Sequence, residues 1–429
     1  MKSSAENDRQ TRSTKLLHMT KHPVTTGILT ALLTCNAVIA QQVSKPLEIM
    51  ALVDHYDFAG VRNPFDKSKF LFDTETAEGC EKILDHVVDQ TKPTTILWRP
   101  CSGSVMRYQS KEEAFPKTLA PIDKRRSIQN ESEIHGWVRY NEAEPDIIRH
   151  MLAVAKSRGL KPGVHWPFEE THWMGWTFGA WNLEHPQYWG VDGSGTPWSG
   201  RTSLAYPEVV AHKLRILDEL LERGAETVFI DTWRSGGWSP AYEYVAPELK
   251  RWEENFHTPP KNAGDPKWCA FIAETVHNYF KQMRAKLDTQ PHKVRLLLGV
   301  SLAQDRSNYD EALMTRGIDW KRFVNEGLID GLVVMAVNWD RKDPFGSTHA
   351  KYREIMDICQ GKCQVFFAVQ AYNFTHKGIP EYIKATNLPA REIAQKLLDI
   401  TRDVQADGVV LECVDYRNYD FYPKAQPSR

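Results

Sequence analysis

Residues 226–238 read ETVFIDTWRSGGW, a short apolar run that ends on Asp231 and passes into polar and aromatic residues. The triplet before Asp231 combines β-branched and aromatic side chains, which is typical of a strand buried on both faces of a parallel sheet. In a parallel barrel the reactive groups lie at the carboxyl ends of the strands. Asp231 is therefore our first candidate for a catalytic carboxylate.

Seven other segments share this pattern, an apolar run that closes in polar or aromatic residues. They occupy residues 46–58, 94–100, 160–170, 294–305, 331–340, 363–373 and 408–416. The stretches between them, such as 77–90 and 208–224, carry apolar residues at spacings of three and four, which is typical of helices. Alternating strands and helices predict an α/β fold with right-handed crossovers, and eight such units favour a closed (β/α)8 TIM barrel.

An open doubly wound sheet is the alternative fold. Its main sequence signal is absent, because the first strand continues as VDHYDFAGVRNP (53–64), which contains no G-x-G-x-x-G turn. The helical pattern is interrupted after the second, third and fourth strands, at 100–143, 167–206 and 232–267. Long loops at these places would lie on the carboxyl side of the barrel and build a substrate cleft. We expect a single domain over residues 41–429.

Residues 1–40 predict an export signal. Two lysines precede an apolar run from Val24 to Ala40, and a small residue stands directly before Gln41, as at a signal peptidase site. A lipoprotein signal through Cys35 and a buried core helix are the alternatives. The pattern favours a signal peptide and an exported protein, periplasmic or extracellular.

Net charge and cysteine spacing limit the kinds of partner and cofactor that we expect for this chain. The formal net charge of −1 gives no indication of a nucleic-acid or membrane-surface partner, so we expect neither once the signal is removed. No C-x-x-C pair occurs, and the first strand ends in DHYD (54–57) in place of His-x-His, so we expect no metal and no cofactor. Cys359 and Cys363 flank a short turn and are the predicted disulfide pair, with buried free thiols as the alternative.

Tryptophans are concentrated where the loops begin. Six of the 14 lie between residues 166 and 198, and Trp98, Trp233 and Trp339 stand at the ends of three strands. A single tryptophan is more often part of a core than of a binding site. Flat apolar rings at the mouth of a cleft, however, suit the C–H faces of sugars. The concentration therefore predicts a carbohydrate partner.

The order of segments resembles that of the family 10 glycosyl hydrolase-like barrels of bacteria. The matching pieces include ALVDHYDF (51–58), SRGLKPGVHW (157–166), GLIDGLVVMAVNWD (327–340) and REIAQKLLDITRDVQADGVVLECVDY (391–416). The resemblance covers most of the chain after residue 40, through motifs that are diffuse. It implies a (β/α)8 glycosidase-like fold and an exported, polysaccharide-related role.

Glycoside hydrolysis normally uses two carboxyl groups on either side of the scissile bond. Our hypothesis takes Asp231 as the nucleophile and Asp340, at the end of the sixth strand, as the general acid/base. Glu412 is the alternative acid/base, because burial in an apolar strand would raise its pKa. The competing structural interpretations are a buried ion pair of Glu412 with Arg99 or another arginine, and a solvated loop or helix cap for Asp340.

Other polar and aromatic residues near strand ends are predicted to bind the substrate. They are Trp98, Arg99, His165, Trp166, Glu169, Trp233, Arg234, Trp339 and Tyr372. The sequence thus predicts an exported glycoside hydrolase. A non-catalytic carbohydrate-binding barrel is the first alternative, and a lyase acting on a uronic-acid polymer is the second, supported by Arg99, Arg234 and the basic run at 124–126. Nothing in the sequence predicts the oligomeric state.

Overall fold

The structure is a computed structural model. It describes residues 46–54, 71–74, 76–102, 105–113, 146–168, 179–232, 238–304, 310–370 and 378–412. All of these belong to one compact unit, Lys45–Arg429. Residues 1–45 lie outside the described ranges, so the export signal stays a prediction.

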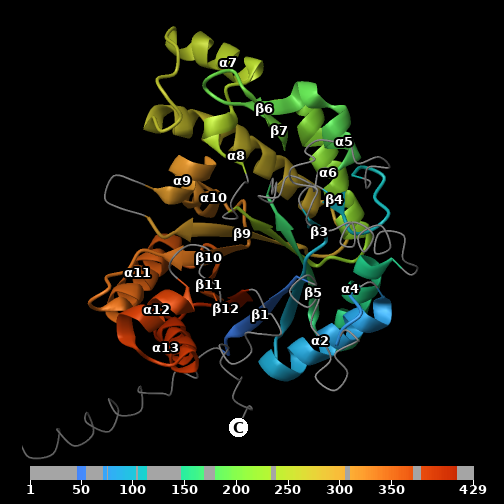
Figure 1. Ribbon diagram of the computed structural model, residues 1–429, viewed down its shortest axis with the longest axis vertical. Helices are drawn as coiled ribbons and strands as arrows, with labels where there is room; N and C mark the ends of the chain where they lie inside the picture. The colour runs from blue at the N-terminus through green and yellow to red at the C-terminus, as the bar shows by residue number, and fades with distance from the viewer. Residues whose placement is uncertain are drawn as a thin grey trace, which may run out of the picture. The chain divides into compact units, whose positions relative to one another are not determined.

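Eight parallel strands form a closed barrel (Figure 1). They are β1 Glu48–Val53, β2 Thr95–Trp98, β5 Lys161–Pro167, β8 Thr227–Asp231, β9 Arg295–Leu302, β10 Gly331–Val337, β11 Gln364–Gln370 and β12 Gly408–Glu412. Around the barrel the order is β1-β12-β11-β10-β9-β8-β5-β2, so each strand pairs with its neighbours in the chain and β12 closes onto β1. Each of the eight predicted strands is a barrel strand, and the predicted (β/α)8 fold is confirmed.

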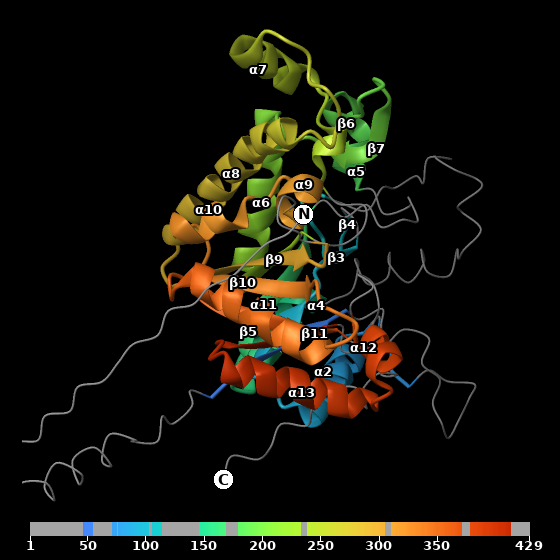
Figure 2. The same cartoon turned by 90° about the vertical axis from the view of Figure 1, so that its left-hand side faces the viewer.

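Helices connect consecutive strands and pack around the outside of the barrel (Figures 1 and 2). They are α2 Ala77–Thr91, α4 Ile147–Ser157, α6 Pro207–Glu222, α8 Pro266–Asp288, α9 Glu311–Arg316, α10 Trp320–Asn325, α11 Pro344–Cys359, α12 Ile379–Thr386 and α13 Ala390–Asp403. No helix in the described ranges combines the length and the apolar character that crossing a membrane requires.

The three predicted insertions contain short elements of their own. These are β3 Cys101–Ser102 and β4 Val105–Met106 after β2; α5 Ala180–Glu184, η3 Pro186–Tyr188, β6 Trp189–Val191 and β7 Pro197–Thr202 after β5; and η4 Pro240–Tyr242 and α7 Ala246–Phe256 after β8. The strands β6 and β7 form an antiparallel hairpin.

Two apolar clusters explain why the strands are hydrophobic on both faces. One fills the inside of the barrel, and its members are Met50, Leu52, Leu97, Phe229, Leu297, Val333, Met335, Phe366, Ala368 and Val410. The larger one lies between strands and helices and takes the alternate residues, such as Val228 and Ile230 on either side of Phe229. Because side chains alternate along a strand, these clusters show which strand residues face the barrel interior and which face the helices.

Trp98 and Trp166 lie on the outward face by this alternation. Both belong to the cluster between strands and helices, and they are 1% and 9% exposed. Their neighbours Arg99 and His165 face the inside of the barrel instead. Both tryptophans therefore pack between strands and helices, and their contact with substrate stays a prediction.

The predicted disulfide is not formed. Cys359 ends α11, Gln360 takes a left-handed conformation (φ 48°), and the chain turns back into β11 just after Cys363. Both cysteines are free thiols. A hydrogen bond from the Cys363 thiol lowers the pKa of Cys359 and raises that of Cys363, so the two groups lie side by side in reduced form.

A carboxylate and an arginine meet inside the amino-terminal end of the barrel. The two oxygens of Glu48 on β1 each lie 2.9 Å from a guanidinium nitrogen of Arg295 on β9, which is the opposite strand of the barrel. Thr227 Oγ1 also accepts a hydrogen bond from Arg295, at 3.2 Å. Burial raises the pKa of Glu48, but hydrogen bonds from Arg295 and Thr95 outweigh this effect and lower it overall. This ion pair closes the end of the barrel away from the predicted site.

We expect Arg295→Met to lower the free energy of unfolding by about 2–3 kcal/mol, because it leaves the partly buried Glu48 carboxylate without its main partner. The folded-state pKa of Glu48 is depressed. Its contribution is therefore present above the unfolded pKa of about 4.3 and is lost as the pH falls through the lower folded pKa. Urea unfolding at neutral and acidic pH measures both effects.

Lys82→Met is the matched control, because its ion pair with Glu78 is solvent-exposed and should contribute nothing measurable. Equal losses in the two variants would contradict a structural role for the Glu48–Arg295 pair.

Candidate active site at the carboxyl end of the barrel

Seven of the eight strands end in a buried polar residue that faces the barrel interior. These residues are Asp54, Arg99, His165, Asp231, Ser301, Gln370 and Glu412, and none is more than 9% exposed. Five of them stand two positions beyond a residue of the inner apolar cluster, as Asp231 does beyond Phe229 and Glu412 beyond Val410. The inner face of the barrel therefore changes from apolar to polar at the carboxyl ends of the strands. We call these seven residues the polar ring.

Asp231 and His165 form a buried pair within the polar ring. His165 Nε2 lies 2.9 Å from Asp231 Oδ2, and both side chains are fully buried. The imidazole also stacks on Phe229, with ring centroids 5.3 Å apart. The chain beyond Asp231 is anchored as well, because Thr232 Oγ1 donates to the Gly299 carbonyl at 2.6 Å. His165 on β5 thus orients the Asp231 carboxylate, and the bond to β9 anchors the chain directly after it.

Asp54 and Arg99 form a second buried pair on β1 and β2. Arg99 donates to Asp54 through a short, charge-assisted hydrogen bond, and Arg107 Nη1 lies 3.5 Å from the other carboxylate oxygen. Arg107 follows β4 and is 4% exposed. Sequence reasoning did not identify Arg107, because nothing in a short irregular stretch indicates that it folds back onto the first strand. Arg99 is thus paired with Asp54. One structural interpretation of the sequence had paired it with Glu412.

Glu412 lies on the last strand, beside Gln370. The two residues are register neighbours on β12 and β11, and Gln370 Nε2 donates to Glu412 Oε2 at 2.6 Å. Glu412 is 1% exposed, so the burial expected from its apolar strand is confirmed. The Gln370 amide is thus one hydrogen-bonding partner of the buried Glu412 carboxyl group.

Asp340 differs from the other two candidate carboxylates because it is exposed. Its side chain accepts a hydrogen bond from the Lys342 main-chain N–H at 2.9 Å, and its own N–H donates to Ser347 Oγ at 2.8 Å. It belongs to the turn that leads from β10 into α11, whose first turn is capped by Asp343. The position matches the solvated-loop interpretation that the sequence left open.

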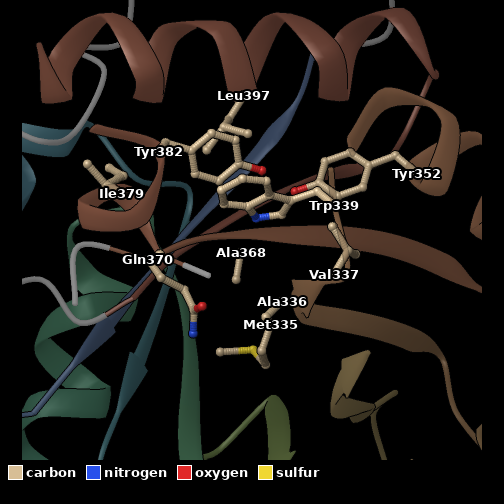
Figure 3. A pocket seen from close by; sticks show the side chains of 11 residues that line it. Met335, Ala336, Val337, Trp339, Tyr352, Ala368, Gln370, Ile379, Tyr382 and Leu397 are labelled. Carbon is tan, nitrogen blue, oxygen red and sulfur yellow. The ribbon is translucent and has the colours of Figure 1, made fainter. Parts of the chain in front are cut away.

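Trp339 lies just before this turn and covers a small cavity (Figure 3). The indole packs against Tyr382, with ring centroids 4.7 Å apart, and is 6% exposed. The cavity holds about 20 Å³, room for about one water molecule, and Gln370 and Met335 also line it. Trp339 thus forms an aromatic wall next to Gln370, the hydrogen-bonding neighbour of Glu412.

Glu311 and Arg316 are polar residues near Asp231 that sequence reasoning missed. Glu311 begins α9, and its Oε2 accepts from Ser301 Oγ at 3.0 Å and from the Gln304 main-chain N–H at 3.1 Å. Burial lowers the pKa of Arg316, while the nearby carboxylates of Asp231 and Glu311 raise it and offset part of that effect. A short helix after a strand carries no sequence signal that its charges return to the barrel mouth.

Four predicted substrate-binding residues fall outside the described ranges. They are Glu169, Trp233, Arg234 and Tyr372. Among the residues that the structure does describe, no group of three or more His, Cys, Asp or Glu side chains is arranged to hold a metal ion.

No family model matches this chain, and no curated protein matches it. Solved structures with some similarity include the spore cortex-lytic enzyme SleL of Bacillus cereus, at 9% identity and a TM-score of 0.42 over 90% of this chain and 76% of that one. SleL of Bacillus megaterium QM B1551 matches at 9% identity and a TM-score of 0.41 over the same shares. A cyclic alpha-maltosyl-(1→6)-maltose hydrolase of Arthrobacter globiformis matches at 9% and 0.40, over 86% and 74%. Similarity at this level supports no conclusion about activity.

We expect His165→Leu to lower the free energy of unfolding by about 2 kcal/mol, because it removes a hydrogen-bond donor from the buried Asp231 carboxylate. His165→Gln, whose amide can still donate, should lose less. Urea unfolding followed by circular dichroism measures the difference.

His349→Leu serves as the control, since that ring bonds the exposed Asp403 and should change stability little. If Leu and Gln at position 165 cost the same, the hydrogen bond to Asp231 is not what the histidine contributes.

Proposed function

We propose that this chain is an exported glycoside hydrolase that cleaves glycosidic bonds of a poly- or oligosaccharide at the polar ring. The observation that carries the proposal is the buried, oriented Asp231 carboxylate at the carboxyl end of β8, the end at which parallel barrels perform their chemistry. The sequence resemblance to the family 10 glycosyl hydrolase-like barrels and the concentration of tryptophans in the loops support a carbohydrate substrate.

In this proposal Asp231 acts on the anomeric carbon. As a nucleophile it forms a glycosyl ester while a second carboxyl group gives its proton to the leaving oxygen. Water then attacks the anomeric carbon and loses a proton to that same second group, and the bond from this carbon to the Asp231 oxygen breaks, which frees the sugar and restores the carboxylate. His165 is a positioning residue, because its hydrogen bond fixes the orientation of the Asp231 carboxylate.

Glu412 and Asp340 are the two candidates for the second carboxyl group. Glu412 faces the barrel interior and is buried, and burial disfavours the charged form of a carboxyl group, as a general acid requires. Asp340 is exposed and engaged in a turn, so it would have to reorient to reach a bond held at Asp231. These contacts lead us to rank Glu412 above Asp340, reversing the order that the sequence suggested.

The substrate would be held by residues around the same ring. Arg99 and His165 support the carboxylates that they contact. Trp339 is buried in the same cluster as Trp98 and Trp166, and all three stay in the proposal on the strength of the sequence. Glu169, Trp233, Arg234 and Tyr372 remain in the proposal as substrate-binding residues on the strength of the sequence. No cofactor enters the proposed chemistry.

We expect Asp231→Asn to lower hydrolysis by at least about a thousandfold, because the amide can neither attack nor serve as a base. Glu412→Gln should lower it by about 100- to 10 000-fold, the range for loss of a general acid, while Asp340→Asn should have a small effect. The assay counts reducing ends released from plant, algal and bacterial polysaccharides. Asp399→Asn, an exposed helical acid, is the control.

A reversed order, with Asp340→Asn inactive and Glu412→Gln active, would restore the pairing of Asp231 with Asp340. Full activity of Asp231→Asn on the cleaved polymer would overturn the role of Asp231. Products that absorb in the ultraviolet through a new double bond would identify the alternative lyase activity.

The second candidate function is a non-catalytic carbohydrate-binding barrel. The exposed position of Asp340 favours it, because the two aspartates that the sequence paired are not assembled as two buried groups. That function predicts retention on one polysaccharide in an affinity gel with no release of reducing ends across the panel.

A further inference from the structure

Two arginines and two aromatic residues gather beside the barrel mouth in a part of the chain that the polar ring does not include. We call Trp198, Arg201, Tyr242 and Arg316 the arginine–aromatic cluster. They come from β7, η4 and α9. The Trp198 and Tyr242 rings pack against each other, and α9 contacts η4.

The geometry of the cluster is that of stacked cation–π contacts. The Arg201 guanidinium lies 4.6 Å from the Trp198 ring centroid and 4.9 Å from that of Tyr242. The centroids of the two rings are 4.0 Å apart. Arg201 is 6% exposed, whereas Trp198 is 37% exposed. Trp198 and Leu249 are the two large apolar side chains that the described part of the chain exposes. The cluster thus presents an aromatic surface to solvent with a cation packed against it.

The cluster is held in place by its surroundings. Gly190 on β6 approaches the Tyr242 carbonyl so closely that a Cβ there would lie 2.7 Å from the oxygen. Val191 accepts a hydrogen bond from the Tyr244 N–H at 3.0 Å, which ties the β6–β7 hairpin to the segment after η4. The rings and the guanidinium are therefore preorganised, which lowers the entropic cost of binding a ligand.

The cluster contains two cations, Arg201 and Arg316, and the carboxylates of Asp231 and Glu311 lie near Arg316. Burial lowers the pKa of Arg201 to about 10, and the nearby Arg316 cation acts in the same direction, so both remain charged at neutral pH. Burial raises the pKa of Glu243, next to Tyr242, while the nearby Arg201 cation opposes this effect. Arg316 in turn lies near Asp231, which connects the cluster to the proposed catalytic carboxylate.

We propose that the arginine–aromatic cluster is a subsite for a carboxylate-bearing sugar residue of the substrate. The exposed Trp198 ring stacks on the sugar ring, and the guanidinium groups of Arg201 and Arg316 attract its carboxylate. The inference rests on the proposed function for its position beside Asp231, and it specifies an acidic polysaccharide as the substrate class. Arginine suits this role because its planar fork matches a carboxylate.

The test measures binding in the Asp231→Asn variant, so that it does not depend on turnover. Calorimetric titrations use oligosaccharides of polygalacturonate, alginate and hyaluronate, each beside its carboxyl-reduced neutral form. We expect at least one acidic oligosaccharide to bind about tenfold more tightly than its neutral form, with a preference that weakens as salt is added. Adding Arg201→Gln or Arg316→Gln should remove that preference, and Trp198→Ala should weaken binding of both forms.

Arg353→Gln and Leu249→Ala are the controls, because they remove an exposed arginine and the other exposed large apolar side chain. Melting temperatures verify that each variant is folded. If Arg201 contributes only packing, Arg201→Gln lowers the melting temperature and leaves the preference for the acidic form intact, which overturns the inference. Equal affinity for acidic and neutral forms of all three polymers overturns it as well.

The two proposals fail in distinguishable ways. A preference for acidic sugars that depends on Arg201, together with no hydrolysis by the parent protein, supports the subsite and contradicts the hydrolase. Hydrolysis that depends on Asp231, without any preference for acidic sugars, supports the hydrolase and contradicts the subsite.

Discussion

Closure of eight parallel strands around an apolar interior imposes the constraint on which the rest of this structure depends. Every strand residue must face either the barrel interior or the helices, with strict alternation between the two. The apolar interior layers leave room for polar groups only at the two ends. One end is closed by the Glu48–Arg295 ion pair, and the other carries the polar ring.

The same constraint gives the buried polar groups their partners. A carboxylate taken out of water is strongly destabilising unless a donor or cation compensates it. In the polar ring Asp231 has His165, Asp54 has Arg99 and Arg107, and Glu412 has Gln370. Each of the three carboxyl groups therefore has at least one partner that compensates its burial.

Alternation also explains which candidate residues face the barrel interior. Four candidate residues face the barrel interior near the ends of their strands: Arg99, His165, Asp231 and Glu412. Because side chains alternate along a strand, this orientation can be deduced once Leu97, Phe229 and Val410 are known to face inward. Trp98 and Trp166 stand one residue away, so the same pattern turns them toward the helices. Their predicted contact with substrate was based on proximity to a strand end and did not consider which face of the strand they occupy.

The sequence by itself determined the eight strands, their order and the burial of Asp231 and Glu412, because hydrophobic periodicity is a local property that the chain displays residue by residue. Tertiary structure alone decided the partners: Arg107 beside Asp54, Glu311 beside Ser301, and Arg201 against Trp198 and Tyr242. These contacts join segments whose short helices and loops have no periodicity to predict their direction. Their positions depend on how the insertions pack on the closed barrel, a property of the whole fold and not of any segment in it.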